Sequence, residues 1–213
     1  MSSRWARLTP PRSRRYGTAA GRRWWTFQNG KASGAVRLAV MGKVLIRPAA
    51  REDLSALREI ERAAVQQFRD YGLDHVADME PPPVEVLASY ADDSRSWVAV
   101  DDSGQTIGYI LVDIIDAGGH IEVVSVAPAH QGQGVGRALI EQVERWAISM
   151  NLSALTLTTF GQIPWNRPLF EHLGFRVMAQ KEISKDVGRI CDAEASHGFD
   201  PDLRVAMRLD LQA

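Results

Sequence analysis

The chain has 213 residues, of which 45% are hydrophobic and 24% charged, a composition typical of a folded globular protein, which excludes disorder throughout and collagen-like repeats. The single cysteine, Cys191, excludes an internal disulfide, and the five histidines show no metal-ligand spacing, so we expect no metal and a reducing, cytoplasmic environment. The net charge of -1 conceals an asymmetry, because all the charges in residues 1–42, eight arginines and Lys31, are basic.

Residues 1–42 therefore form a basic arm, and their lack of apolar periodicity predicts disorder. Met41 immediately precedes the first strand pattern, so we expect the natural start there, with residues 1–40 as a translated upstream stretch; a targeting signal is the alternative. Nucleic-acid binding would depend on this arm alone and is not expected. The longest apolar stretch, residues 107–112, is far too short to cross a membrane.

The first elements are a strand and then helices. Residues 43–48 predict a strand that ends at Pro48, and residues 51–69 predict an amphipathic helix, because apolar side chains recur there every three or four positions. Residues 71–83 include three consecutive prolines and predict a loop, and residues 84–90 predict a shorter helix.

The next segments predict an antiparallel meander of three strands. Residues 97–101 and 105–115 are joined by a hairpin signal at residues 102–104, and Gly118-Gly119 introduces a third strand over residues 120–126.

A glycine-rich loop at residues 131–136 then leads into a helix over residues 137–150 and a strand over residues 154–159. This βαβ unit places one parallel pair in an otherwise antiparallel sheet. A helix over residues 168–173, a strand from Phe175 and a last strand over residues 204–209 complete the pattern. The fold class is mixed α/β, with a mostly antiparallel central sheet flanked by helices, in one domain over residues 43–213.

The loop that opens the helix over residues 137–150 is suited to phosphate. Its backbone N–H groups and the helix dipole converge on one point, and Gly132, Gly134 and Gly136 allow a close approach and positive φ angles. A dinucleotide fingerprint fails because Arg137 stands where the third glycine is needed, and a P-loop fails because it lacks Gly-Lys-Ser/Thr. A turn that merely connects strand and helix is the structural alternative.

Two motifs occur in order around this loop. A strand ending in Val-x-Pro and followed by Gln-x-x-Gly-x-Gly reads as residues 126–128 and 131–136, and Asn166 precedes Leu-Phe-x-x-x-Gly-Phe at residues 169–175. Together with the opening pattern at residues 46–49, these motifs resemble the GCN5-related N-acetyltransferase (GNAT) family. The resemblance covers residues 43–210 and implies the acyl-CoA N-acyltransferase fold and an N-acetyltransferase that uses acetyl-CoA as cosubstrate.

In that family the loop amides hold the CoA pyrophosphate, and the preceding strand pairs its backbone with pantetheine. The resemblance therefore implies a cofactor site made of Val124, Ser125, Val126, Gln131, Gly132, Gln133, Gly134, Val135, Gly136, Arg137, Asn166 and Phe170. Core packing of Val124 and Val126 and helix capping by Asn166 are the alternatives for those residues.

Acetyl transfer to an amine needs a base and a donor for the oxyanion. Glu122 is the predicted base, because it is the only carboxylate within the strand that leads to the loop and alternation puts it on the face of Val124 and Val126. A rim glutamate paired with an arginine is the alternative. A backbone N–H near Val124 is the predicted oxyanion donor.

The acid for the departing thiolate is where the chain departs from the family. Phe170 stands where a tyrosine is usual and has no proton to give. Thr158, Thr159, His172, Tyr109 and water remain open as donors. A non-catalytic or weakly active acyl-CoA-binding regulatory domain is the alternative function that Phe170 raises.

The acceptor side is expected to involve residues 71–83 and 160–165. Asp74, Asp78 and Glu80 would favour a cationic amine or would simply form a solvated polar loop, and Phe160 and Trp165 would form an apolar wall or pack. The acceptor is expected to be a small-molecule or peptide amine. Its identity, the acyl group and the oligomeric state, a homodimer included, stay open.

Overall fold

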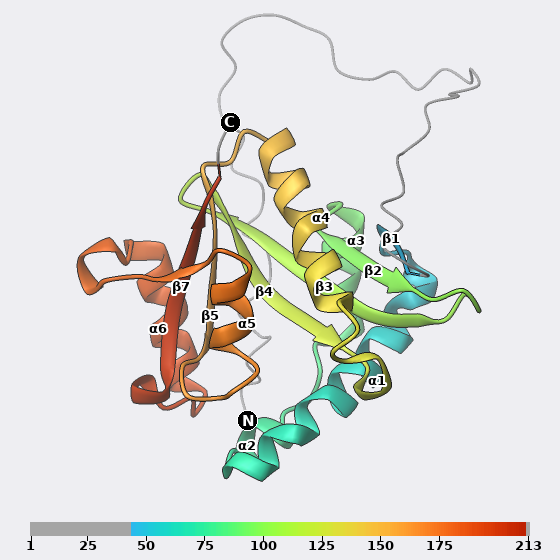
Figure 1. Ribbon diagram of the computed structural model, residues 1–213, viewed down its shortest axis with the longest axis horizontal. Helices are drawn as coiled ribbons and strands as arrows, with labels where there is room; N and C mark the ends of the chain where they lie inside the picture. The colour runs from blue at the N-terminus through green and yellow to red at the C-terminus, as the bar shows by residue number, and fades with distance from the viewer. Residues whose placement is uncertain (1–43, 212–213) are drawn as a thin grey trace, which may run out of the picture.

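The computed structural model describes residues 44–211, and Figure 1 draws its chain path. The basic arm expected over residues 1–42 and the start expected at Met41 lie outside the described residues. In chain order the elements are β1 (Leu45–Pro48), α1 (Leu54–Ala64), α2 (Asp74–Ala77), α3 (Val84–Asp92), β2 (Ser96–Val100), β3 (Thr106–Ile115), β4 (Gly118–Val126), α4 (Val135–Ser149), β5 (Ala154–Phe160), α5 (Arg167–His172), β6 (Arg176–Val177), α6 (Lys185–Ser196) and β7 (Arg204–Asp210).

The helix predicted over residues 51–69 is divided by its geometry. The α-helical part is α1, which is preceded by the 3-10 turn η2 (Arg51–Asp53) and followed by the 3-10 helix η3 (Val65–Tyr71). Gly72 ends the run with φ +69°, a left-handed conformation that favours glycine. The expected loop that follows contains the short helix α2 before its prolines.

All seven strands join one sheet in the order β1-β2-β3-β4-β5-β7-β6. Every neighbouring pair is antiparallel except β4 and β5, which are parallel and are connected by α4. The mixed sheet with one parallel βαβ unit is therefore confirmed.

The turn between β3 and β4 was misplaced in the sequence reading. The chain reverses at Asp116 and Ala117, which both have positive φ angles, whereas Gly118 and Gly119 lie inside β4. A Cβ on Gly119 would come within 2.7 Å of the Leu155 side chain on β5, so this glycine serves the close packing of the two parallel strands.

Helix α6 between β6 and β7 was not anticipated. Its start carries a recognisable signal, because the Ser184 hydroxyl caps the helix by accepting a hydrogen bond from the Val187 N–H at 3.1 Å and Asp186 occupies the first turn. Only one side of the helix is apolar, and Val187 packs there with Met178 and Ala206.

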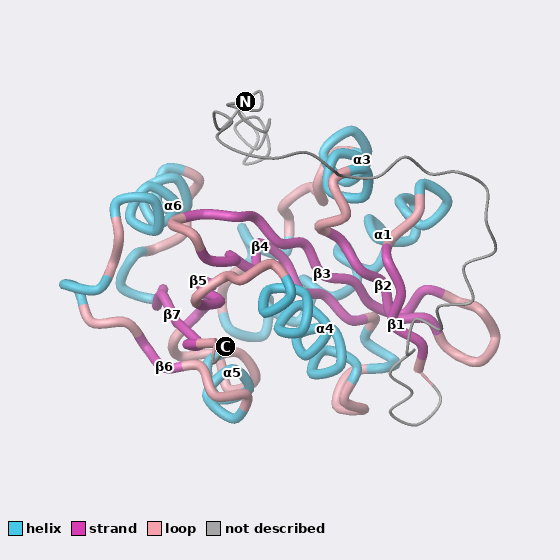
Figure 2. Tube along the Cα trace, turned by 90° about the horizontal axis from the view of Figure 1, so that it is seen from above, coloured by secondary structure: helices cyan, strands magenta, loops and turns pink. Residues whose placement is uncertain are grey.

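Helices cover both faces of the sheet. Figure 2 shows α4 and α5 on one face and α1, α3 and α6 on the other. The first face holds the main core, to which α4 contributes Leu139, Ile140 and Val143. On the opposite face, α1 and α3 bury a second cluster over β2, β3 and β4. A ligand between β4 and β5 would therefore have helices on both sides.

Asp53 ties the first strand to the first helix. Its carboxylate accepts hydrogen bonds from the Arg47 guanidinium at 2.7 and 2.9 Å, from the Ala50 N–H at 2.8 Å and from the Thr106 hydroxyl at 3.0 Å. Burial raises the pKa of this carboxyl, but the hydrogen bonds and the Arg47 charge outweigh burial, so the pKa lies below its ordinary value.

Asp53→Asn is expected to lower the free energy of unfolding at neutral pH by about 2 kcal/mol, the scale of a hydrogen bond to a charged group. A lowered folded-state pKa stabilises the protein above the ordinary pKa of aspartate, and this stabilisation is lost as the pH falls through the folded value. Urea unfolding of both proteins from neutral to acid pH should give stabilities that converge at the acid end. A difference that stays constant with pH would contradict this account.

Candidate active site

Strands β4 and β5 separate after a short parallel ladder. They pair at Gly119 with Leu155, His120 with Thr156 and Ile121 with Leu157. Both strands then continue without pairing, β4 to Val126 and β5 to Phe160. The sheet is thus open between them on the side where β4 runs into the glycine-rich loop, and we call this opening the slot.

The β4 backbone presents alternate residues to the slot. The Ala127 N–H donates to the Ile107 carbonyl at 2.9 Å, and antiparallel partners alternate between bonded and non-bonded pairs, so Ser125 bonds toward β3 opposite Tyr109. Val124 and Val126 consequently direct their N–H and C=O groups toward β5. Their side chains are partly buried against the main core, so the packing alternative holds for these side chains while the backbones face the slot.

One of these groups is already engaged within the chain. The Gln131 side-chain amide donates to the Val126 carbonyl at 3.1 Å. Ser125, the third predicted cofactor residue of the strand, turns its hydroxyl to the α1 side, where it donates to the Glu61 carboxylate.

The glycine-rich loop turns at residues 131–134 and opens α4. Gly132 and Gly134 have φ angles of +72° and +83°, as predicted, and Gly134 is the N-cap of the helix. The expectation of a positive φ was wrong for Gly136, which lies inside the first helical turn. Because helix α4 begins at Val135 instead of Arg137, the first-turn N–H groups without an intrahelical acceptor come from Val135, Gly136 and Arg137. Together with the helix dipole, they form an anion site beside the end of β4.

The predicted base, Glu122, lies at a bulge in β4. Leu111 pairs with Val123 and Val112 with Ile121, so Glu122 is the additional residue between them. This bulge breaks the alternation that was expected to align Glu122 with Val124 and Val126. Instead its charge acts on Tyr90 of α3, whose pKa is raised mainly by burial and further by Asp113 and Glu122. The charge of Glu122 is therefore felt on the α3 side of the sheet.

Asn166 and Phe170 lie at the start and in the middle of α5. Asn166 occupies the N-cap position but its side chain makes no capping hydrogen bond, so the capping alternative is not realised. Phe170 is 7% exposed and its ring packs against Phe175 at a centroid distance of 5.8 Å in the main core. A hydroxyl is therefore absent from this position, and the ring has a packing role.

The acidic side chains expected to attract a cation are neutralised. Asp74 and Asp78 both pair with Arg69, and Glu80 lies 3.7 Å from Arg58 and 3.8 Å from Arg62. The alternative of a solvated polar loop describes them better.

The aromatic side chains on this side pack together. Phe160 and Trp165 both lie near Phe68, at centroid distances of 5.3 and 6.2 Å, and Phe199 from the segment after α6 closes on Phe160 at 5.9 Å. The packing alternative is therefore realised for both aromatic residues.

Two residues that the sequence did not single out complete the β5 side of the slot. Glu194 on α6 is buried, accepts a hydrogen bond from the Thr158 hydroxyl at 2.7 Å and pairs with Arg204 at 2.5 Å. The Arg204 guanidinium also lies 4.7 Å from the ring centroid of Phe160. Because Thr158 already donates to Glu194, this network fixes the slot-side strand and occupies one predicted proton donor. Tyr109 is likewise occupied, since it is fully buried and donates to Glu61 at 2.9 Å.

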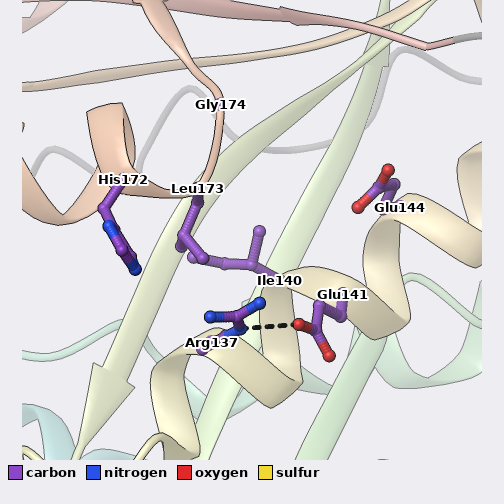
Figure 3. A pocket seen from close by; sticks show the side chains of 7 residues that line it. All are labelled: Arg137, Ile140, Glu141, Glu144, His172, Leu173 and Gly174. Atoms are coloured by element: carbon purple, nitrogen blue, oxygen red, sulfur yellow. Dashed lines mark hydrogen bonds and ion pairs between the residues drawn. The ribbon is translucent and has the colours of Figure 1, made fainter.

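A groove of about 330 Å³ lies between α4 and α5 (Figure 3). Arg137 donates to Glu141 at 2.7 Å within it, so its side chain runs along α4 and away from the glycine-rich loop. His172, another predicted proton donor, faces this groove from α5 (Figure 3). The full lining is Arg137, Ile140, Glu141, Glu144, His172, Leu173 and Gly174.

Comparison with known proteins assigns the chain to a family. The sequence model of the acetyltransferase (GNAT) family matches residues 56–175, more than half of the chain. The chain belongs to the GNAT family. It is an acetyl-CoA-dependent N-acetyltransferase.

The names of related GNAT proteins refer to different substrates. Peptidyl-lysine N-acetyltransferase YjaB from Salmonella typhimurium is 24% identical over 147 residues, which cover 68% of this chain and 90% of that protein. Mycothiol acetyltransferase from Propionibacterium freudenreichii is 28% identical over 204 residues, which cover 82% of this chain and 62% of that protein.

Solved GNAT structures share the fold. PaiA N-acetyltransferase from Thermoplasma acidophilum, in complex with coenzyme A, has a TM-score of 0.60 at 17% identity and covers 79% of this chain and 99% of its own. The ribosomal-protein-S18-alanine N-acetyltransferase from Escherichia coli has a TM-score of 0.55 at 17% identity, covering 80% of this chain and 95% of its own. The GNAT fold expected from the motifs is confirmed.

Within residues 44–211, no helix is both long and apolar enough to cross a membrane. Among the same residues, no three His, Cys, Asp or Glu side chains gather closely enough to hold a metal ion.

Proposed function

We propose that this GNAT enzyme transfers the acetyl group of acetyl-CoA directly to a primary amine. The observation that carries the proposal is the coincidence of two features: unpaired β4 backbone along the slot, and the helix N-terminus at the end of the same strand. The slot suits an extended amide-bearing chain, and the helix N-terminus suits a phosphate. Pantetheine and pyrophosphate are joined in that order in coenzyme A.

Separate groups of residues would bind the pyrophosphate and the pantetheine arm of the cofactor. The amides of residues 131–137 would hold the pyrophosphate, and the backbones of Val124 and Val126 would pair with the pantetheine arm as another strand would. Asn166 carries a side-chain amide that is not used in capping and would bind the arm from the α5 side. The bound cosubstrate supplies an activated acetyl thioester.

The chain's own groups would then manage charge and protons. Glu122 would accept, through a water, the proton that an ammonium must lose before its nitrogen attacks the thioester carbon. The Val124 N–H would donate to the oxygen that becomes negative as the carbon–nitrogen bond forms. When the carbon–sulfur bond breaks, the thiolate leaves with a pKa near 8.5, so transfer proceeds without a tyrosine at position 170, although more slowly.

The relatives' names give a protein lysine in one case and mycothiol in another. A small-molecule or peptide amine is proposed here.

Thermal unfolding with and without acetyl-CoA tests the cofactor, and an amine screen tests the transfer. A ligand at about one hundred times its Kd adds about 2.7 kcal/mol, which is a rise in Tm of roughly 5–10 °C for a chain of this size. Amines that release CoA should gain one acetyl group by mass spectrometry. An unchanged Tm at millimolar acetyl-CoA would refute the proposal, and binding without transfer to any amine would favour the regulatory alternative.

A further inference from the structure

The α1 side of β4 carries a carboxylate that the proposed mechanism does not use. Glu61 of α1 is half-buried and points at the sheet, where one of its oxygens, Oε2, accepts hydrogen bonds from two hydroxyls. One comes from Tyr109, which is fully buried on β3, and the other from Ser125, which is 9% exposed on β4. The position of the Glu61 carboxylate is thus fixed by groups that are themselves held in the sheet.

Other carboxylates in the same layer have a cation beside them. Asp53 pairs with Arg47 at 2.7 Å, Glu194 pairs with Arg204 at 2.5 Å, and Asp113 pairs with Arg95. Among residues 44–211, no Lys, Arg or His forms an ion pair with Glu61. Glu61 is partly buried, and its hydrogen-bond partners are two neutral hydroxyls. It therefore lacks the opposite charge that compensates the other three carboxylates.

The position of Glu61 relates it to the slot. Ser125, to which it is bonded, lies between Val124 and Val126, the two residues whose backbones face β5. The side chains of Val124 and Val126 pack on the α4 side, whereas Ser125 faces α1. A cation held at Glu61 would therefore lie beside the strand that borders the slot, on the face opposite to the main core.

We propose that Glu61 binds the acceptor's ammonium group and selects a cationic amine as substrate. This inference rests on the proposed acetyl transfer and names the substrate class for it. The ammonium would provide the opposite charge that Arg47, Arg95 and Arg204 give to the neighbouring carboxylates. Glu61 thereby takes the acceptor-selecting role that the sequence had offered to Asp74, Asp78 and Glu80, whose charges are neutralised by arginines.

Glu61→Gln tests this role while keeping an oxygen for both hydroxyls, and Glu59→Gln is the matched control. Glu59 lies on the same helix but has a 74% exposed side chain that pairs with Arg62. The probes are Nα-acetyl-lysine methylamide, spermidine and glycinamide, with Nα-acetyl-norleucine methylamide as the uncharged comparison. Each compound is titrated calorimetrically into CoA-loaded enzyme, and the three amines are assayed separately for acetylation with acetyl-CoA as the donor.

We expect at least one amine to bind the wild type and Glu59→Gln equally, to bind Glu61→Gln at least tenfold more weakly, and to show a matching rise in KM. The KM for acetyl-CoA should stay unchanged, and Nα-acetyl-norleucine methylamide should not distinguish the variants. Equal amine binding by wild type and Glu61→Gln, whatever the change in Tm, would overturn the inference, as would a CoA-loaded wild type that binds none of the amines. Failure to bind acetyl-CoA at all would instead refute the proposed function, so the two failures are distinguishable.

Discussion

Gly134→Glu is expected to raise the Kd for acetyl-CoA at least a hundredfold and to remove acetyl transfer with it. Gly134 is the N-cap of α4 with a φ of +83°, and a carboxylate there would lie among the N–H groups proposed to hold the pyrophosphate. Placing like charges together at an interface costs several kcal/mol, and about 2.7 kcal/mol already corresponds to a hundredfold change in Kd. Isothermal titration with acetyl-CoA measures the change directly.

Gly104→Glu is the matched control for this variant. Gly104 has a φ of +84°, and in both glycines a Cβ would meet no atom within 4 Å, so the two substitutions impose the same backbone strain. Gly104 lies in the β2–β3 hairpin. Both variants should lose about 1–2 kcal/mol of stability, but only Gly134→Glu should lose the cofactor. Equal acetyl-CoA binding by the two variants would contradict a pyrophosphate site at this loop.

Glu122→Gln is expected to lower kcat by about a hundredfold or more, the usual contribution of general base catalysis, and to remove the acidic limb of the pH–rate profile. The KM for acetyl-CoA should change little, because the proposed cofactor contacts come from the β4 backbone and the glycine-rich loop. Steady-state kinetics across pH, with both substrates varied, checks this result.

Glu85→Gln controls for the loss of an acidic side chain, since Glu85 is exposed in the first turn of α3. The Tm of both variants must be measured as well, because Glu122 also acts electrostatically on buried Tyr90. A Glu122→Gln enzyme that folds and retains the wild-type kcat would assign the base to another group.

Much of the fold was predictable because its signals are local. The apolar spacing in α1 and the glycines before α4 depend only on residues that are close together in the sequence. The motifs at residues 126–136 and 166–175 are local in the same way. The bulge at Glu122 was not predictable, because it depends on how β3 pairs with β4 and leaves no local signal. One additional residue in the strand was enough to invalidate an inference from alternation.

The missed residues share a different cause. Glu61 and Glu194 look like ordinary helix glutamates in sequence, and their importance comes from partners 64 and 36 positions away, Ser125 and Thr158. Helix α6 itself could have been found from its capping serine, Ser184. The sequence could not show which side chains of α6 would be buried, because their burial depends on where the helix packs.

The short ladder between β4 and β5 has a consequence for how readily the protein is degraded. Within the sheet itself, three residue pairs join the β1–β4 part to the β5–β7 part. A cofactor bound in the slot as proposed would act as an eighth strand and would add its binding free energy to the folded state only. Amide hydrogen exchange along this seam should slow sharply on addition of acetyl-CoA. On this proposal, a shortage of acetyl-CoA in the cell would leave more of the enzyme without the added stabilisation, so proteolysis would couple the abundance of the enzyme to the supply of its own substrate.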